Sequence, residues 1–322
     1  MSPRLSIVIP THQRTDLLSC CLSSVIRYRP SDTQVLVVDD GSPDARASRT
    51  AEAFGVEAVR LPAPRGFCVA ANVGVAHSRG EVVALLNDDT EVTAGWADAA
   101  LAPFADPTVA AVTPLVLLGP PGVHQPERID SAGDGYSVGG VAYKRGHRQP
   151  LAADYLEPRP VFGASGSGSF FRRAAYLAAG GMPEEFGAYF DDVDLSFRLH
   201  HAGYTVRFEP ASRIYHRVSS SYGRPSARLL RLQSRNEELV FWRNLPAGDL
   251  VRALPFHLAV LLGKAVRRMR EGGLLPWLAG RLEVLGWVGA ICRHRRRHLQ
   301  AHRPVGTWGV GWRLPVRRSA AA

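Results

Sequence analysis

The chain has 322 residues, 46% of them hydrophobic and 8% aromatic, which excludes a disordered or fibrous protein and allows one large core with an appendage. Its formal net charge of +10 is unevenly distributed, since residues 1–216 hold 19 basic and 24 acidic side chains (19 − 24 = −5) and residues 217–322 hold 20 and 5 (20 − 5 = +15). The basic character therefore belongs to the last third, and the acidic first two-thirds argue against nucleic acid as the main partner.

Strand and helix patterns alternate along the first third of the chain. Apolar runs predict strands at residues 5–9, 34–38, 57–61 and 82–86, and apolar side chains at helical spacing predict helices at 16–28, 43–54 and 69–77. This order predicts an α/β fold with a mostly parallel sheet and helices on both faces.

The rest of the chain is less regular. Residues 113–160 are rich in Gly and Pro and predict a meandering segment with short strands. Helices are predicted at residues 172–179 and 191–202, and a strand at 204–208. The final hundred residues are helical and basic, and we expect them to form a C-terminal helical extension.

Two of the predicted strands end in adjacent carboxylates. Asn87-Asp88-Asp89 follows the strand at 82–86, and Asp39-Asp40 ends the strand at 34–38. Open α/β sheets bind ligands at the carboxyl ends of their strands, where paired oxygen donors suit a divalent cation that holds a diphosphate. A carboxylate after the second strand suits a base N–H or a ribose hydroxyl, although Asp-Gly is also a common turn sequence.

A third acidic group, Asp191-Asp192-Val193-Asp194, opens a predicted helix, where the helix dipole favours negative charge. Tyr189 and Phe190 precede it, and a carboxylate half-shielded by these rings suits a general base. His216 follows a predicted strand and is either a metal ligand or a satisfied core histidine.

Together with residues 6–11, Arg65-Gly66-Phe67 and Asn72, these motifs resemble the glycosyltransferases of family 2, and in particular bacterial rhamnosyltransferases and galactofuranosyltransferases. The resemblance covers about residues 5–222 and implies the Rossmann-like GT-A fold. It implies a GT-A domain at 1–222, with a nucleotide-sugar-binding half at 1–115 and an acceptor-binding half at 116–222. A basic helical region at 223–322 follows.

The resemblance also implies roles for the matching residues. Donor contacts fall on Pro10, Thr11, Asp40, Arg65, Asn72, Asn87 and Asp88. Asp89 and His216 would hold Mg²⁺ or Mn²⁺, and Asp192 would be the catalytic base. Acceptor contacts fall on Gly166, Ser167 and Asp191. Two positions depart from the family pattern, because Arg65 stands where Asn is more usual and Asn87 replaces the first acid of Asp-x-Asp.

These roles imply a metal-assisted, inverting transfer of a sugar from a dTDP- or UDP-sugar donor to a hydroxyl of a glycan or lipid-linked acceptor. Two alternatives are glycosylation of a secondary metabolite and a non-catalytic sugar-nucleotide-binding protein that docks on a membrane. A dinucleotide-binding oxidoreductase is not expected, because the first strand is followed by Pro10-Thr11-His12-Gln13-Arg14 and not by G-x-G-x-x-G.

The C-terminal region places apolar faces beside clustered arginines, among them Arg267, Arg268 and Arg270. This pattern fits docking on an anionic membrane surface, and it equally fits a helical subdomain with a solvated basic face. Arg281 and Glu283 interrupt the apolar run, so we expect no membrane-spanning helix. Without a signal-peptide pattern, the protein is expected in the cytoplasm, with a peripheral place at the inner face of the cell membrane if the tail docks there.

Overall fold

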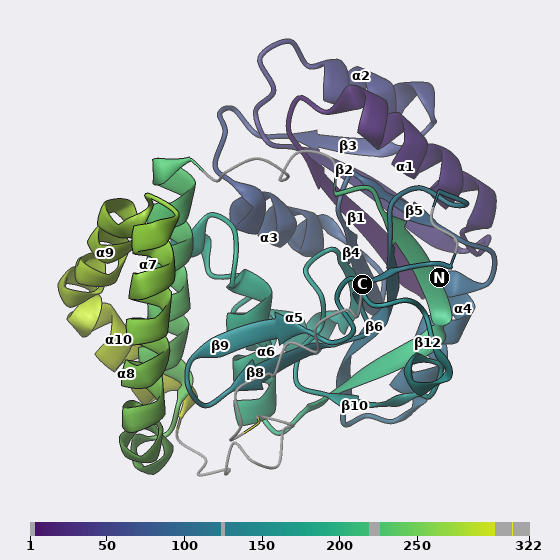
Figure 1. Cartoon of the computed structure of the whole chain (residues 1–322). Coiled ribbons are helices and arrows are strands. Elements are labelled where there is room, and N and C mark those ends of the chain that lie inside the picture. Colours follow the sequence, from purple (N-terminus) through teal and green to yellow (C-terminus); the bar gives the residue numbers. More distant parts are fainter. Residues whose placement is uncertain (1–3, 124–125, 219–225, 300–310, 312–322) are drawn as a thin grey trace.

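The computed structural model describes residues 4–123, 126–218, 226–299 and 311. An α/β body carries the sheet, and a group of C-terminal helices stands beside it (Figure 1). The mixed α/β fold with a C-terminal helical extension is therefore confirmed.

Strands and helices alternate up to residue 86, as predicted. The elements are β1 (Leu5–Thr11), α1 (Thr15–Tyr28), β2 (Thr33–Asp39), α2 (Arg46–Ala53), β3 (Glu57–Arg60), α3 (Phe67–His77) and β4 (Val82–Leu86). Strands β3, β2, β1 and β4 are neighbours in this order, and all three pairings are parallel. Their carboxyl ends therefore meet at one edge of the sheet, which is where the acidic motifs were placed by the sequence.

Helices cover both faces of the sheet because side chains alternate along each strand. In β1, Ile7 and Ile9 face one side and belong to a core with residues of α1, α2 and α4 (Trp96–Leu101). Val8 faces the other side, whose core includes α3, α5 (Arg173–Ala178) and α6 (Asp191–His201). Burial on both faces leaves only the strand ends to form a polar site.

The sheet continues past β4 with strands that the sequence analysis missed or shortened. β11 (Gly168–Arg172) runs antiparallel between β4 and β6 (Val109–Leu118), and β12 (Thr205–His216) lies parallel to β6. β6 is buried along its whole length and lacks the alternation that marks a half-exposed strand. The expectation of only short strands from residue 113 onward is therefore wrong for the first part of that segment.

β12 extends past the predicted end at residue 208 to His216. Its pairing with β6 is irregular between Glu209 and Arg213, and regular pairing then resumes. The smaller elements of this half are β5 (Thr90–Val92), η1 (Ala102–Ala105), β7 (Ile129–Ser131), β8 (Asp134–Ser137), β9 (Val141–Lys144), η2 (Ala153–Tyr155), β10 (Arg159–Val161) and η3 (Glu184–Phe186).

The described C-terminal region is helical. Its elements are α7 (Ala227–Asn244), α8 (Ala247–Arg270), α9 (Leu274–Glu283), η4 (Val284–Trp287) and α10 (Val288–His298). α7 is tied to α6 because Arg243 Nε and Asn244 Nδ2 both donate to Asp194 Oδ1, at 2.5 and 2.7 Å. The predicted domain boundary at residue 222 lies outside the described residues, and the division of the chain there stays a prediction.

The stretch Leu274–His298 is long and apolar enough, by length and composition alone, to cross a membrane. The expectation that Arg281 and Glu283 rule out a membrane-spanning helix is therefore too strict, because the stretch is apolar enough on average with both charges included. In the structure this stretch is divided into α9, η4 and α10, and Trp277 and Gly280 are buried. Its composition is weak support for a spanning segment, since core helices meet the same criterion.

Candidate active site

A cavity of about 520 Å³ opens at the carboxyl edge of the parallel strands. Its lining includes Pro10, Thr11, Asp40, Asn87, Asp88, Asp89, Gly166, Ser167, Asp191, Asp192 and His216. Residues at or just after the ends of β1, β2, β4 and β12, with the segment before β11 and the start of α6, therefore meet around one space. Arg65 and Asn72 are the two predicted site residues that do not line it.

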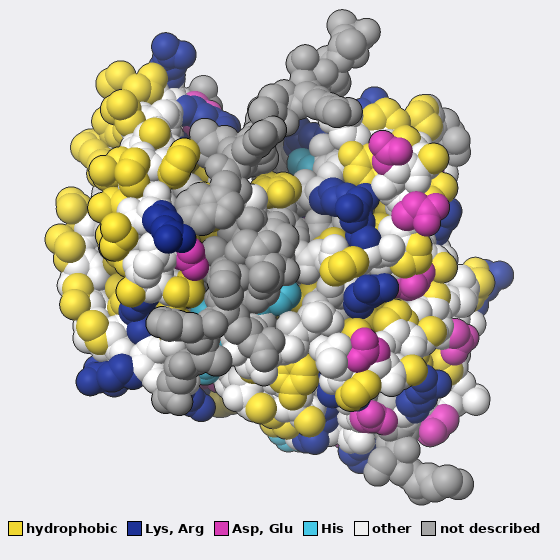
Figure 2. Space-filling view, turned by 90° about the horizontal axis from the view of Figure 1, so that it is seen from below, with side chains coloured by type: hydrophobic (Ala, Val, Ile, Leu, Met, Phe, Trp, Pro, Cys, Tyr) yellow, Lys and Arg dark blue, Asp and Glu magenta, His cyan; other side chains and the backbone are white. Residues whose placement is uncertain are grey.

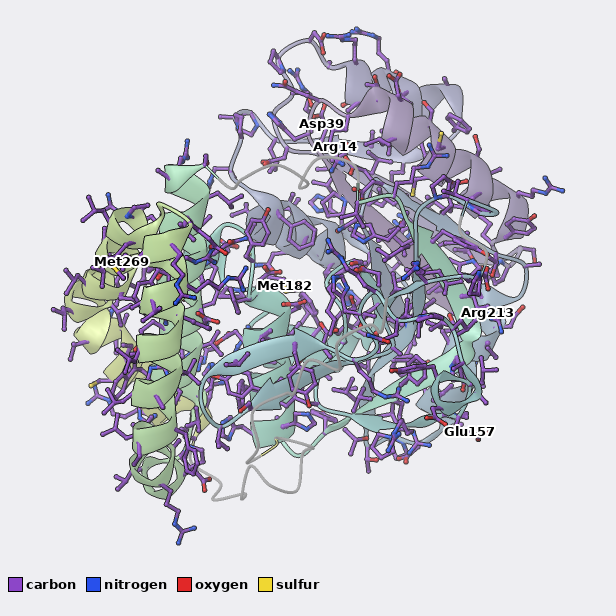
Figure 3. The ribbon with its side chains drawn as sticks, viewed as in Figure 1. Arg14, Asp39, Glu157, Met182, Arg213 and Met269 are labelled. Carbon is purple, nitrogen blue, oxygen red and sulfur yellow. The ribbon has the colours of Figure 1, made fainter. Side chains whose placement is uncertain are left out.

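The end of β4 meets the end of β1 through a buried hydrogen bond. Thr11 Oγ1 donates to Asp88 Oδ2 at 2.7 Å. The Arg14 guanidinium, at the same end of the sheet (Figure 3), lies 3.1 Å from Asp88 Oδ1 and 2.9 Å from Asp89 Oδ2. Burial raises the pKa of Asp88 to about 6, against the opposing effect of Arg14. A cation thus already balances this acidic pair.

His216 bridges two carboxylates at the other side of the pair. Because β12 pairs with β5, His216 stands opposite Thr90 and next to Asp89. Its Nε2 lies 3.2 Å from Asp89 Oδ1, and its Nδ1 lies 2.9 Å from Asp130 Oδ2. Burial lowers the pKa of His216, but these two hydrogen-bonded carboxylates outweigh it and raise the pKa overall. His216 is therefore protonated more readily than a free histidine.

Lys144 of β9 adds a third cation to the cavity. Its Nζ donates to Asp130 Oδ2 at 2.8 Å and lies 3.5 Å from Ser167 Oγ. Although burial opposes its charge, the neighbouring Asp130 raises the pKa of Lys144. Arg14, Lys144 and His216 together surround the acidic pair with positive charge, a suitable setting for phosphate oxygens.

The potential metal-ligand atoms at the end of β4 suit a divalent cation. Asp88, Asp89 and His216 offer carboxylate oxygens and an imidazole nitrogen, which suit Mg²⁺ or Mn²⁺. These atoms are engaged with Arg14 and with each other, and no group of three His, Cys, Asp or Glu side chains in the described residues is arranged as a metal centre. Metal binding would therefore require these side chains to exchange partners.

Asp40 is held by the loop that precedes α3. Its two carboxylate oxygens accept hydrogen bonds from the backbone N–H groups of Arg65 and Gly66, at 2.7 and 2.8 Å. Each oxygen keeps a second lone pair that can accept from a ligand. Arg65 contributes its backbone to this arrangement and its side chain is exposed, so a donor contact by that side chain has no support from the geometry.

Asn72 serves packing within the described structure. Its Nδ2 donates to the Met182 carbonyl at 2.9 Å, and its Oδ1 accepts from the Met182 N–H and the Tyr176 hydroxyl, both at 2.8 Å. These bonds join α3 to the turn after α5, where Met182 lies (Figure 3). Both polar atoms of the Asn72 side chain thus have internal partners, and its contact with the sugar donor stays a prediction.

The three acids at the start of α6 have separate environments. Asp192 Oδ2 accepts from the Gly166 N–H, and Oδ1 accepts from the Val193 N–H, both at 2.8 Å. Burial raises the pKa of Asp192 despite these hydrogen bonds, and burial together with the charge of Asp192 raises the pKa of Asp191 to about 8. Asp194 points instead to Arg198 and Arg243, outside the cavity.

Gly166 is small because Asp192 approaches it closely. A Cβ atom on Gly166 would lie 2.8 Å from Asp192 Oδ2, which is shorter than real contacts of this kind. The absence of a side chain at Gly166 thus allows its backbone amide to orient the predicted base. Gly166 therefore helps to hold the Asp192 side chain in position.

The loop before α6 has unusual backbone angles. Gly187, Tyr189 and Phe190 have φ values of 71°, 69° and 65°, a region that side-chain-bearing residues rarely adopt. Asn236 of α7 holds this loop, since its Nδ2 lies 2.9 to 3.1 Å from the carbonyl oxygens of Phe186, Ala188 and Tyr189. Strain next to Asp191 and Asp192 is typical of functional loops.

Sequence reasoning missed Arg14, Asp130 and Lys144. Each is a single charged residue in a loop or short strand with no local motif around it. The sequence holds two weak indications of these residues. Arg14 ends the segment Pro10-Thr11-His12-Gln13-Arg14, and Asp130 follows the apolar Ile129. Their convergence depends on long-range pairing, which no local pattern indicates.

Solved structures with the same fold are GT-A glycosyltransferases. A mannosyltransferase from Pyrobaculum calidifontis in complex with GDP-Man and Mn²⁺ aligns with a TM-score of 0.57 at 18% identity, over 96% of this chain and 84% of that one. GalNAc-T7 with UDP, GalNAc and Mn²⁺ aligns with a TM-score of 0.59, also at 18% identity, over 80% and 54%. At 18% identity these two likenesses show the fold alone. The Mn²⁺ ions are part of those two structures.

The family follows from the sequence comparison. The model described as Glycosyl transferase family 2 matches residues 6–178, more than half of the chain, and the chain belongs to this family. An uncharacterized protein of Sinorhizobium fredii, y4gI, is 33% identical over 255 residues, 73% of this chain and 27% of its own length.

Two relatives from Mycobacterium tuberculosis are named for a transferase activity. A pre-mycofactocin glycosyltransferase is 28% identical over 90% of this chain and 64% of its own length. An N-acetylglucosaminyl-diphospho-decaprenol L-rhamnosyltransferase is 27% identical over 84% and 97%. The chain thus spans less than two-thirds of y4gI and of the pre-mycofactocin enzyme.

Proposed function

We propose that the protein transfers a sugar from a nucleotide-diphosphate donor to an acceptor hydroxyl with inversion at the anomeric carbon. The observation that carries this proposal is that Asp192, the acidic pair Asp88-Asp89 and three cationic side chains line one cavity. A nucleoside would contact Thr11 and Asp40, and its diphosphate would lie among Arg14, Lys144 and His216. The sugar would then stand between the diphosphate and Asp192.

Asp192 acts as the general base in this mechanism. It takes the proton of the acceptor hydroxyl while that oxygen forms its bond to the anomeric carbon from the face opposite the diphosphate. The bond from the anomeric carbon to the phosphate oxygen breaks, and the nucleoside diphosphate leaves with the electron pair. The raised pKa of Asp192 makes it a stronger base than an exposed aspartate. A divalent cation held by Asp89 and His216 would neutralise charge on the leaving diphosphate.

The Asp192→Asn variant tests this assignment. We expect transfer to fall by roughly 10²- to 10⁴-fold, because the amide cannot accept the proton, while donor binding persists. Product formation with a panel of dTDP- and UDP-sugars, with Mg²⁺ or Mn²⁺, would measure the rate. Asp98→Asn, the same change at an exposed position in α4, is the matched control. Near-parental transfer by a folded Asp192→Asn protein would rule out this base.

The acceptor is proposed to be a glycan or lipid-linked saccharide. Support comes from the rhamnosyltransferase relative, which is named for a diphospho-decaprenol-linked sugar and is covered over 97% of its length. A secondary metabolite is the second candidate, supported by the pre-mycofactocin glycosyltransferase. A non-catalytic sugar-nucleotide-binding protein would bind a donor from the panel and give neither transfer nor donor hydrolysis.

Docking of the C-terminal helices on an anionic membrane from the cytoplasmic side is part of the proposal. Hydrophobic side chains gather over these helices with basic residues at their edges (Figure 2). Leu275 and Leu285 are 79% and 71% exposed, and the exposed apolar set on α8 to α10 also includes Val251, Leu254, Phe256, Leu258, Leu262, Val266, Met269, Leu278, Leu282 and Val288. A monomer rarely exposes so many large apolar residues on one region. The adjacent arginines match anionic head groups in charge.

Vesicle binding tests the docking. The full chain should co-sediment with vesicles that contain phosphatidylglycerol and bind less to pure phosphatidylcholine. Replacing Leu275, Leu282 and Leu285 by Ser should weaken binding by roughly tenfold or more, because three apolar contacts are lost. The control replaces Leu156 and Leu177, which are exposed on the α/β body, by Ser. Equal loss in both variants, or no vesicle binding, would contradict the docking.

A further inference from the structure

A second cavity adjoins the first and shares Asp192 with it. It has a volume of about 360 Å³ and lies between the β8–β9 hairpin, the start of α6 and helices α7, α8 and α9. Lys144, Tyr189, Phe190 and Asp192 line both cavities. The second cavity does not include Asp88 or Asp89 in its lining, so a molecule bound there would reach Asp192 without occupying the site of the acidic pair.

The outer wall of this second cavity is cationic. Lys264, Arg267 and Arg268 of α8 line it, and Glu237 is the carboxylate on the same wall. Glu237 is already paired with Lys264 and with Arg281. Negative charge on this wall is therefore compensated before any ligand arrives.

Arg267 and Arg268 retain donor capacity. Both pair with the single carboxylate of Glu271, at 2.7 Å each, and the Arg267 side chain is 61% exposed. Each guanidinium carries five N–H donors in a planar fork that matches phosphate oxygens. The two side chains can therefore bind a phosphate while they keep their pairing with Glu271.

The inner end of the second cavity is less charged than its carboxyl groups imply. Asp134 lies there beside Asp192, and its Oδ1 accepts from Ser131 Oγ at 2.7 Å. Burial, with the charge of Asp192, raises the pKa of Asp134 to about 7. A neutral sugar hydroxyl therefore suits the inner end, and an anionic group suits the outer end.

On the basis of the proposed transfer, we infer that the second cavity binds a phosphate-bearing acceptor, with Arg267 and Arg268 on its phosphate and the attacking hydroxyl at Asp192. The ligand class is a saccharide joined to a phosphate or diphosphate. Such a group occurs on a lipid carrier or on a soluble sugar phosphate. The exposed Met269 and Leu275 next to the cationic wall offer an apolar surface where a lipid chain would emerge.

A binding experiment on the full chain separates this inference from the proposed reaction. The probes are farnesyl-diphosphate-linked N-acetylglucosamine, the soluble N-acetylglucosamine 1-phosphate, and the phosphate-free octyl glycoside of the same sugar. Calorimetry measures their affinity with the donor site saturated by the nucleoside diphosphate that binds best. Slow donor hydrolysis without acceptor reports on the proposed reaction alone.

The variant Arg267→Gln/Arg268→Gln should bind the phosphate-bearing probes roughly 10- to 100-fold more weakly and hydrolyse donor at the parental rate. Binding of the octyl glycoside should not change. The matched control is Arg252→Gln/Arg270→Gln, two exposed arginines of α8 that do not line the cavity. It should bind all probes as the parent does.

Three results would overturn the inference: parental affinity of the cavity variant for the phosphate-bearing probes, equal weakening in the control variant, or equal weakening for the octyl glycoside. Absent donor hydrolysis in the parent would instead count against the proposed reaction. If both phosphate-bearing probes respond to the cavity variant, the phosphate subsite is supported. Tighter binding of the farnesyl probe in the parent would assign the lipid-borne source.

Discussion

Three aspartates within one helical turn have three different tasks. Asp191 is buried at the cavity wall, Asp192 lines the same cavity and accepts from the Gly166 N–H, and Asp194 is 0% exposed and pairs with Arg198 and Arg243. Burial opposes the charge of Asp194, but Arg243 and Arg198 lower its pKa well below the usual range. The sequence predicted an acidic helix start and a base at Asp192, but it could not separate these environments, because the partners lie on another helix.

Removing the charge of Asp194 should destabilise the protein. The Asp194→Asn variant leaves the buried Arg198 without its carboxylate partner and Arg243 with Glu185 alone, and breaking such a buried ion pair costs about 3 to 5 kcal/mol of unfolding free energy. Urea denaturation followed by circular dichroism measures it. Asp98→Asn should lose less than about 0.5 kcal/mol, as exposed substitutions do. A similar small loss for Asp194→Asn would show that this ion-pair cluster does not hold α6.

The raised pKa of Asp191 makes stability depend on pH. The folded protein binds a proton at Asp191 up to about pH 8, whereas the unfolded chain releases it near the ordinary value of 3.8. The stabilisation of the folded state by protonated Asp191 is therefore fully present below the ordinary pKa of 3.8. It is lost as pH rises through about 8. The Asp191→Asn variant removes this loss.

The melting temperature of Asp191→Asn relative to the parent should therefore increase between pH 5 and pH 8. Differential scanning fluorimetry at several pH values measures the difference. The Asp98→Asn variant should show no such trend, since Asp98 is exposed on α4. An offset for Asp191→Asn that does not vary with pH would show that Asp191 ionises normally in the folded protein.

At the scale of elements, α7 supports the loop that carries the predicted base. Asn236 is 0% exposed and is bonded to three carbonyls of residues 186–189, so a helix of the C-terminal region holds strained backbone beside Asp192. A local sequence pattern cannot indicate this, because the donor and its acceptors lie about fifty positions apart.

The Asn236→Ala variant should reduce both stability and turnover. The buried carbonyl of Phe186 and the partly buried carbonyls of Ala188 and Tyr189 lose their donor, which costs about 1 to 3 kcal/mol, and the loop at 187–190 can leave its left-handed conformation. Transfer rates with hydrogen exchange of residues 186–190 measure the two effects. Arg228→Ala, on an exposed part of α7, is the control. Unchanged exchange and turnover would show that the loop holds its shape unaided.

The sheet shows where local patterns suffice and where they do not. β4 has the predicted bounds because its apolar run ends at a polar turn, and the parallel order of β1 to β4 follows from alternation with helices. β6 and β11 were not predicted, since one is buried throughout and the other is a short run preceded by glycines and serines. Asp40, Asp89, Asp192 and His216 were expected to meet around one pocket, and all four line the same cavity, while their roles stay predictions.

At the scale of the whole molecule, the basic C-terminal helices are not a mere tail. They wall the second cavity, support the loop before α6 and present an apolar outer surface. Some of the basic side chains behind the net charge of +15 beyond residue 216 form internal ion pairs, such as Arg243 with Asp194 and Arg281 with Glu237. The excess of basic residues predicts docking of these helices on an anionic membrane. It could not reveal the internal ion pairs, because their acidic partners lie elsewhere in the sequence.

The contact of Asp194 with Arg243 and Asn244 has a practical consequence for protein engineering. A chimaera that borrows its acceptor half from another member of the family would inherit one side of this contact without the other if the splice falls between α6 and α7. The two helices need to be transplanted as a unit. Recombination libraries with crossovers inside that interval should therefore yield mostly insoluble proteins.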